Sequence, residues 1–282
     1  MGLASLALIL SQVTISSVSV SPLVLHFFDI GYGDAILVQL PEGGAILIDS
    51  GKPEDGAALV EQIRALGLQR LESVFITHFH KDHAGGLLPI LDAFLAEPLR
   101  GDNSQHPIIV PLIPETGETE VESVLKEIKR RGYRLVRRRE TLRLSPSVQM
   151  HVLHPKRLLG NPNDDSLVLR IEYGAHAFLF GGDVGLIAQQ DLLAVYGEAL
   201  KADLLKIPHH ANEVFNDGFE AFIQTVAPKI AVLTLGPNRY GAPNPELLSL
   251  YEKRVYRLLR TDQDGTITVK SDGRTLQIET ER

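Results

Sequence analysis

Hydrophobic residues alternate between strand-type and helix-type spacing along the chain, and this pattern predicts an α/β protein. Three β-type runs, 23–30, 35–40 and 45–50, are separated by glycine-containing breaks that read as tight turns. We expect these runs to form consecutive antiparallel strands. Residues 57–66 then place apolar side chains at helical spacing, and 71–77 is again apolar and β-rich.

The second half of the chain repeats the order of strands and helices. Apolar runs predict strands near 148–153, 167–173, 177–180, 203–207, 230–235 and 266–269, and helices near 187–195 and 245–251. In the first half, 84–94 and an apolar stripe from Val121 to Ile128 predict two more helices. Two such halves suggest two packed sheets covered outside by helices. We expect a single domain over 22–282, with the loop at 98–117 as its weakest boundary.

Composition narrows the chemistry that this chain can perform. Its 282 residues, 44% of them hydrophobic, are enough for a sizeable core. A net charge of −7 gives no overall attraction to nucleic acid or anionic membranes, so a polyanion would have to meet a local patch. Cysteine is absent, which excludes disulfides and thiolate ligands. A metal ion would therefore be held by imidazole, carboxylate, amide or water.

The first 21 residues contain a short apolar run followed by small polar residues. This pattern fits either a secretory signal peptide or a leader outside the fold, so cytoplasmic and exported locations both stay open. The apolar run is too short to span a bilayer, and we expect no integral membrane association.

The segment His78-Phe-His80-Lys-Asp82-His83 carries the strongest chemical signal in the sequence. It directly follows a buried-strand pattern, and residues at i and i+2 of extended backbone point the same way. His78 and His80 are therefore expected to coordinate one cation. Asp82 and His83 lie just beyond and are expected to coordinate a second cation. Nitrogen and oxygen ligands suit zinc, with manganese or iron as alternatives.

On these residues the sequence resembles the metallo-β-lactamase superfamily, whose hallmark is His-x-His-x-Asp-His after a strand. The resemblance implies an αββα four-layer sandwich in which two mixed sheets are flanked by helices. It also implies that Asp49 supports the metal loop and that Asp183 bridges two metal ions. One member of the pair His209-His210 is expected to complete the second metal site, and the other to contact a phosphate or protonate the leaving group.

Within the superfamily, the chain resembles the hydrolase domain of ComEC-type competence proteins and their stand-alone relatives. The segments 28–35, 163–169 and 235–241 carry this resemblance. These segments contain residues that we expect to support the metal site or to contact the substrate. Together with Asp49, the set comprises Asp34, Asn163, Ser166, Asn238 and Tyr240. Two departures stand out: Asn163 occupies a position where many superfamily members have a histidine, and Ala242 precedes a proline where relatives commonly have histidine.

We therefore expect a metal-dependent hydrolase that uses two divalent metal ions, zinc first and manganese second, and an activated water. The metal ligands expected are His78, His80, Asp82, His83, Asp183, His209 and His210, with Asp82 and His210 also catalytic. A phosphodiesterase or nuclease-like activity is the leading expectation. The alternatives are a degenerate metal-binding domain, motivated by Asn163 and Ala242, and an ester or thioester hydrolase.

The expected substrate is a phosphodiester or another small anion. Basic residues are concentrated in the run Lys126–Arg139, which is the candidate surface for binding nucleic acid. Interleaved glutamates instead favour an ordinary solvated helix face for this run. The oligomeric state is left open.

Overall fold

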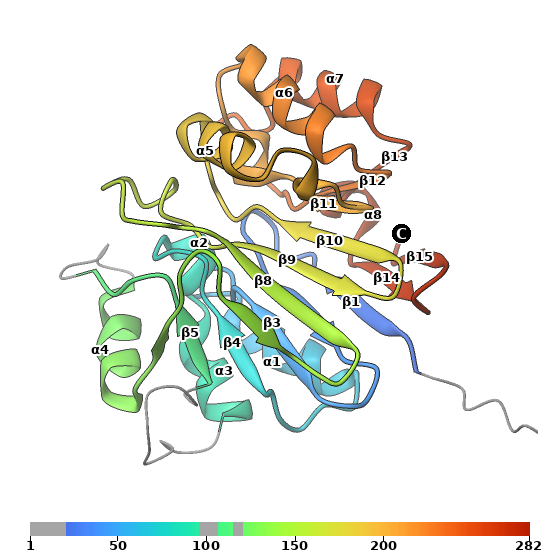
Figure 1. Cartoon of the computed structure of the whole chain (residues 1–282). Helices are drawn as coiled ribbons and strands as arrows, with labels where there is room; N and C mark the ends of the chain where they lie inside the picture. The colour runs from blue at the N-terminus through green and yellow to red at the C-terminus, as the bar shows by residue number, and fades with distance from the viewer. Residues whose placement is uncertain (1–20, 96–106, 115–120) are drawn as a thin grey trace, which may run out of the picture.

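The computed structural model describes residues 21–95, 107–114 and 121–282 (Figure 1). The predicted leader, apart from Ser21, lies outside the described residues, as does most of the predicted loop at 98–117. The rest of the chain forms two sheets with helices on their outer sides.

The first sheet has eight strands in the order β15-β14-β1-β2-β3-β4-β5-β6. Its β1, β2 and β3 pair antiparallel, whereas β3, β4, β5 and β6 run parallel, so the sheet is mixed. The strands are β1 Leu23–Phe27, β2 Ile36–Gln39, β3 Ala45–Ile48, β4 Ser73–Phe75, β5 Ile108–Val110, β6 Arg134–Leu135, β14 Ile267–Ser271 and β15 Leu276–Thr280.

The second sheet has seven strands in the order β13-β12-β11-β10-β9-β8-β7 and is also mixed. Its β10, β11, β12 and β13 run parallel, and β7 to β10 pair antiparallel. The strands are β7 Thr141–Arg143, β8 Val148–His154, β9 Val168–Tyr173, β10 His176–Phe180, β11 Leu204–Lys206, β12 Ile230–Leu233 and β13 Arg257–Arg260.

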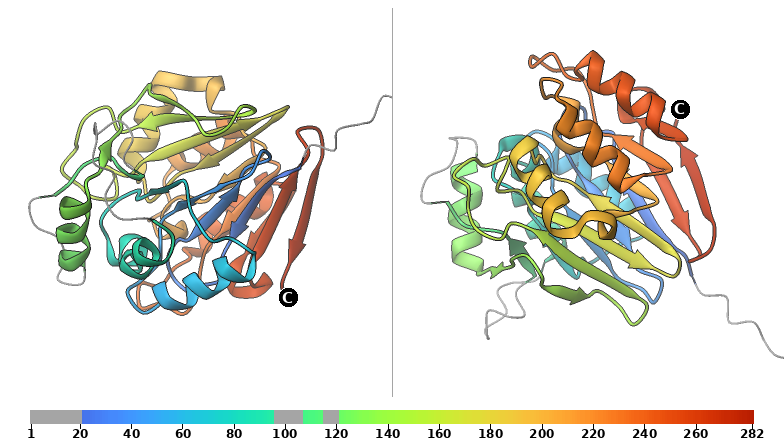
Figure 2. Two further views of the ribbon diagram at one scale, coloured as in Figure 1. Left: turned by 90° about the horizontal axis from the view of Figure 1, so that it is seen from below. Right: turned by 45° about the horizontal axis from the view of Figure 1, so that its top comes forward.

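Three apolar layers hold the four-layer sandwich together. The layer between the sheets contains Phe27 and Phe75 from one sheet and Phe178 and Phe180 from the other, all buried. A second layer packs the first sheet against α1 and α3, and a third packs the second sheet against α5, α6 and α7 (Figures 1 and 2). The helices are α1 Gly56–Ala65, α2 Lys81–Ala84, α3 Leu87–Phe94, α4 Glu122–Arg131, α5 Leu186–Tyr196, α6 Asp217–Val226, α7 Pro245–Arg254 and α8 Thr261–Asp264.

The predicted αββα arrangement with two mixed sheets is confirmed. The three opening strands pair antiparallel as expected. The expected helix at 84–94 is divided into α2 and α3, with Gly85 and Gly86 between them. Within the described parts of the chain, no helix has the length and hydropathy needed to cross a bilayer.

Candidate metal centre

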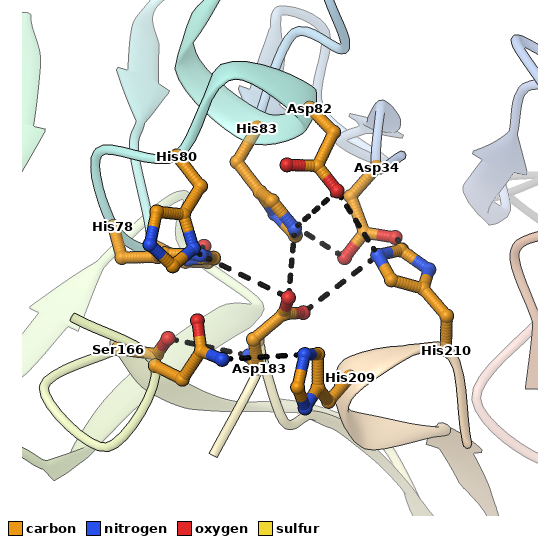
Figure 3. Close-up of polar contacts among 12 residues, drawn as sticks. Asp34, His78, His80, Asp82, His83, Ser166, Asp183, His209 and His210 are labelled. Atoms are coloured by element: carbon orange, nitrogen blue, oxygen red, sulfur yellow. Dashed lines mark hydrogen bonds and ion pairs between the residues drawn. The ribbon is translucent and has the colours of Figure 1, made fainter. Parts of the chain in front are cut away.

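The loop after β4 brings the predicted histidines together (Figure 3). His80 has extended backbone with φ −83° and ψ 155°, and α2 begins directly after it. His78 Nε2 lies 3.0 Å from His80 Nδ1, so both rings face the same space. His83, on α2, turns its Nε2 toward the same region, 3.9 Å from Asp82 Oδ2. All four motif residues therefore converge on one centre.

Asp49 holds this loop in place from the end of β3. Its Oδ1 accepts a hydrogen bond of 2.8 Å from the Thr77 amide, and its Oδ2 accepts one of 2.7 Å from the Thr77 hydroxyl. The Asp49 carboxylate also lies 2.9 Å from His83 Nδ1, which fixes that nitrogen as the donor. His83 Nε2 is thus left to face the centre, and it lies 3.1 Å from Asp183.

Asp183 enters from the opposite sheet, in the turn after β10. The Asp183 amide donates to Ser166 Oγ at 3.2 Å. Gly182 has φ +53°, and a Cβ there would lie 2.8 Å from Ser166 Cβ, so this turn requires glycine. Asp183 Oδ2 lies 3.8 Å from His78 Nε2, whereas Oδ1 lies 3.9 Å from His210 Nε2. The two oxygens of one carboxylate therefore face different groups of imidazoles.

The pair His209-His210 lies in a tight turn after β11 with unusual backbone. His209, His210 and Ala211 all have positive φ, at 49°, 51° and 54°. Such conformations are strained for residues with a Cβ and concentrate at functional sites. His210 is buried, and its Nδ1 donates to the Thr234 carbonyl oxygen at 2.8 Å, which leaves Nε2 as the free nitrogen. That nitrogen lies 3.8 Å from Asp82 Oδ2.

His209 points to a different part of the centre. Its Nδ1 lies 2.7 Å from Glu213 Oε1, and its Nε2 lies 3.2 Å from Asn163 Nδ2. Burial lowers the pKa of His209, but the hydrogen bond to Glu213 and the charge of Asp183 outweigh burial and raise it. His209, Glu213 and Asn163 thus form a polar chain at the edge of the centre.

Several buried polar atoms of the centre lack a partner among the described residues, and their chemistry suits a cation. Among the described buried side-chain atoms, four lack a hydrogen-bond partner, and three of these are Asn163 Oδ1, Asp183 Oδ1 and His210 Nε2. Leaving such atoms unsatisfied is costly unless something binds them. The side chains also form compact groups of potential ligands whose atoms lie within 4.8 Å of one another: His78, His83 and Asp183, and Asp82, His83 and His210. The donor set fits a divalent metal with nitrogen and oxygen ligands.

The protonation of the histidines agrees with this interpretation. Burial and the neighbouring His83 hold the pKa of His78 well below its usual range, and burial likewise lowers that of His210. Both rings are therefore neutral, as metal ligands must be. Burial alone would lower the pKa of His83, but Asp183, Asp49 and Asp82 raise it well above the usual value. A cation held by these carboxylates would supply the positive charge that the raised pKa of His83 shows they favour.

Lys206 is a part of the centre that the sequence pattern did not single out. This side chain is fully buried at the end of β11, and its Nζ lies 2.5 Å from Asp34 Oδ2 and 3.7 Å from Asp183 Oδ1. Asp34 Oδ1 also accepts a hydrogen bond of 2.6 Å from Thr234. The available signal was a lysine at the end of an otherwise apolar strand, since a buried charge needs a partner.

The remaining predicted residues lie around this centre or shape its loops. Asn238 Oδ1 accepts from the amides of Tyr240 and Ala242, and its Nδ2 donates to the carbonyls of Gly236 and Ala242, so it holds its own loop together. Tyr240 is exposed over 48% of its surface and lies at the rim.

Two carboxylates next to Asn163 are engaged elsewhere. Asp164 accepts hydrogen bonds from the amides of Gly185 and Ala188 at the start of α5. Asp165 accepts them from the amides of Leu159 and Gly160. Neither carboxylate belongs to the compact ligand groups found among the described residues.

The basic run is largely neutralised by ion pairs. On α4, Lys126 lies 2.9 Å from Glu122 and Arg130 lies 2.7 Å from Glu127. Further pairs join Arg131 to Glu127 and Asp92, Arg134 to Glu140, and Arg138 to Asp191. Most of these cations are therefore already paired, and the Arg131 and Arg138 side chains are nearly buried rather than solvated.

These features define a two-sheet αββα fold with a polar centre of potential metal ligands at the strand ends. The family model described as "Metallo-beta-lactamase superfamily" matches residues 29–214, and the chain belongs to this superfamily. The fold is generally hydrolytic and implies binding of divalent metal, in agreement with the ligand groups found here.

Curated relatives confirm the resemblance to ComEC-type proteins. ComE operon protein 3 of Bacillus subtilis is 30% identical over 273 residues, covering 89% of this chain and 33% of that protein. Competence protein ComA of Neisseria gonorrhoeae is 24% identical over 85% of this chain and 31% of its own length. Recombination protein 2 of Haemophilus influenzae is 24% identical over 86% of this chain and 28% of its own length. The chain spans about a third of the length of these relatives.

Solved structures share the fold at low sequence identity. Tm1679, titled a metal-dependent hydrolase of the β-lactamase superfamily, matches with a TM-score of 0.55 and 15% identity, covering 89% of this chain and 100% of that one. A mutant of the CmlA β-hydroxylase matches with a TM-score of 0.53 and 18% identity, covering 88% of this chain and 53% of that one. At this identity the likeness concerns the fold alone.

Proposed function

We propose that this chain is a phosphodiesterase that uses two divalent metal ions, zinc first and manganese as the alternative. One observation carries the proposal: the two oxygens of Asp183 face His78 and His83 on one side and His210 on the other. A carboxylate in that position suits two cations that share it. When bound, such cations lower the pKa of water to about 7 and offset charge on the attacked and leaving oxygens.

The ligands divide between the two sides of Asp183. One ion would be held by His78, His80 and Asp183, and the unpartnered Asn163 Oδ1 is a further candidate ligand. The other would be held by Asp82, His210, Asp183 and His83, which belongs to both compact ligand groups. His210 is assigned as the ligand of its pair because its free Nε2 faces both Asp82 and Asp183.

The chain's own side chains supply the remaining chemistry. Asp82 is the more accessible carboxylate, with its side chain 15% exposed against 3% for Asp183, and it orients the attacking water. His209, held by Glu213, donates a proton to the leaving oxygen. The sequence left the two roles within this pair open, and this assignment makes His210 the ligand and His209 the acid.

Two observations favour a phosphodiester over an ester or thioester. Lys52, Lys81 and Arg239 line a cleft beside the centre and suit an anionic substrate. Two relatives are named for competence and for recombination, and from these names we infer a substrate with phosphodiester bonds.

Hydrolysis of bis(p-nitrophenyl) phosphate tests the proposal. Wild-type protein supplied with zinc or manganese should hydrolyse this ester. Asp82→Ala should abolish the hydrolysis, whereas Glu252→Ala, at an exposed position of α7, should leave it unchanged. Metal binding without turnover would favour the degenerate domain instead. Turnover of p-nitrophenyl acetate alone would favour the ester hydrolase.

A further inference from the structure

A cleft of about 590 Å³ opens beside the candidate metal centre. Its lining comes from the loop before β2, the segment before α1, the start of α2 and the loop after β12. It adjoins the centre at two points: Lys81 directly precedes Asp82, and the Tyr32 ring lies 4.4 Å from the His210 ring.

Positive charge gathers in this cleft although the chain as a whole is acidic. Lys52, Lys81 and Arg239 line it, against the single carboxylate of Glu54. The net charge of the chain is −7, so this is a local reversal of sign. It is the kind of patch that an anionic ligand requires on an acidic protein.

Aromatic rings lead from the buried centre to the rim of the cleft. Tyr32 is buried at 4% exposure, and its ring lies 5.1 Å from the ring of Tyr240, which is 48% exposed. The Arg239 guanidinium lies 5.4 Å from the Tyr240 ring centroid. About half of Tyr240 is therefore open to solvent, and this exposed part of the ring, with the Arg239 guanidinium over it, is offered to a flat ligand.

The loop that carries Tyr240 is held in place by its own backbone contacts. Asn238 hydrogen-bonds to Gly236, Tyr240 and Ala242, and the backbone of Gly236 packs on Gly31 so closely that a Cβ would lie 2.4 Å from Gly31 Cα. The ring is thus presented in a preorganised position, which reduces the entropy lost on binding.

We propose that this cleft is a nucleotide subsite for single-stranded nucleic acid. A base stacks on Tyr240, and its phosphate lies among Lys52, Lys81 and Arg239, while the neighbouring phosphodiester reaches the metal centre. A base inside a duplex is already stacked on both faces, so only an unpaired base can use the ring. The inference rests on the proposed function and adds its substrate class.

Equilibrium binding to the full chain, loaded with metal, tests this subsite. Fluorescence anisotropy compares a short labelled oligothymidylate, an abasic strand with as many phosphates, and a duplex, all with phosphorothioate linkages that keep the charge and resist hydrolysis. The oligothymidylate should bind about tenfold more tightly than the abasic strand, as expected for base stacking on an aromatic ring. Tyr240→Ala should remove this preference and Tyr240→Phe should keep it. Tyr256→Ala, at a residue 93% exposed and outside the cleft, should also keep it.

The charges are tested with the same probes. Arg239→Gln should weaken binding of both single strands, and Arg274→Gln, an exposed arginine that does not line the cleft, should leave binding unchanged. Equal binding of the base-bearing and abasic strands would overturn the proposal, as would equal binding of the duplex or a preference that survives Tyr240→Ala. Failure of the proposed function shows separately, as absence of bis(p-nitrophenyl) phosphate turnover, because binding requires no hydrolysis.

Discussion

Lys206 Nζ lies 2.5 Å from Asp34 Oδ2, and both side chains are buried beneath the candidate metal centre. Burial lowers the pKa of Lys206, but Asp34 and Asp183 outweigh this and raise it, so the ammonium stays charged. Burial likewise raises the pKa of Asp34, and Lys206, His210 and His83 together bring it below its usual value. The pair is thus a permanent ionic element of the centre.

Replacing Lys206 by methionine should therefore destabilise the fold by about 3–5 kcal/mol, because Asp34 is left as an uncompensated buried charge. Urea unfolding measures the change. Lys229→Met removes an exposed ion pair with Asp203 and should cost less than about 1 kcal/mol. Combining Lys206→Met with Asp34→Ala should cost less than the sum of the single changes. An additive double variant would show that the two charges do not depend on each other.

Removing the support beneath His83 should weaken metal binding. Asp49→Asn loses the carboxylate that orients His83 and fixes the Thr77 turn, and such outer partners typically contribute 10–100-fold in metal affinity. Isothermal titration with zinc measures the affinity. Asp203→Asn, which breaks a surface pair away from the centre, is the control. Unchanged affinity in Asp49→Asn would contradict the role assigned to this carboxylate.

Metal should be taken up in two steps of different affinity. The side with Asp82, His83 and His210 has a full set of ligands, whereas Asn163 offers only a neutral oxygen to the other side. Elemental analysis should find about two ions per chain at saturation and one after mild chelation. His80→Ala should lose the weaker ion and keep the tighter one. A single ion at saturation would rule out the dinuclear assignment.

The proton-donor role of His209 can be tested through the leaving group. A leaving group of high pKa needs a proton, whereas p-nitrophenolate leaves without one. His209→Ala should therefore slow hydrolysis of an alkyl phosphodiester by about 100-fold or more, and that of the nitrophenyl ester much less. Glu213→Gln should shift the same ratio in the same direction but by a smaller factor. Equal losses on both substrates would instead indicate a structural role for His209.

Acid stability should depend on Asp203. Burial raises the pKa of Asp203, but hydrogen bonds from Lys229 and the Ala177 amide outweigh burial and lower it. The unfolded carboxylate therefore takes up its proton at a higher pH than the folded one, and the stabilisation is lost as pH falls through the folded pKa.

Wild type and Asp203→Asn should accordingly differ in urea midpoint at neutral pH, and the difference should shrink as pH falls below about 4. Glu252→Gln, at an exposed position of α7, serves as the control. A difference that persists unchanged at low pH would contradict the assigned pKa shift.

Much of the fold could be predicted because its core elements have clear periodicity. The runs that became β1, β2 and β3 are apolar and bounded by turn residues, so local sequence determines them. Strand β6 has only two residues, which is too short for any pattern to show. Helix α6 was missed although Phe219, Phe222, Ile223 and Val226 recur at helical spacing and are buried.

The candidate centre was likewise predictable from the sequence only in part. His78, His80, Asp82 and His83 are neighbours in sequence, so spacing alone brings them together. The approach of Asp183 and Lys206 depends on how two sheets pack, and no local pattern encodes that. The family resemblance supplied Asp183, whereas Lys206 was not predicted because it ends a strand that otherwise looks apolar.

The ligands of the centre come from both halves of the chain, and His83 and Asp183 are separated by 100 residues. A cation held between them would close a long loop of the unfolded chain, and the entropy removed by such a closure grows with loop length. This chain has no cysteine with which to make a covalent cross-link. Its metal centre would therefore also act as a reversible cross-link between the two sheets, present only while the cation stays bound.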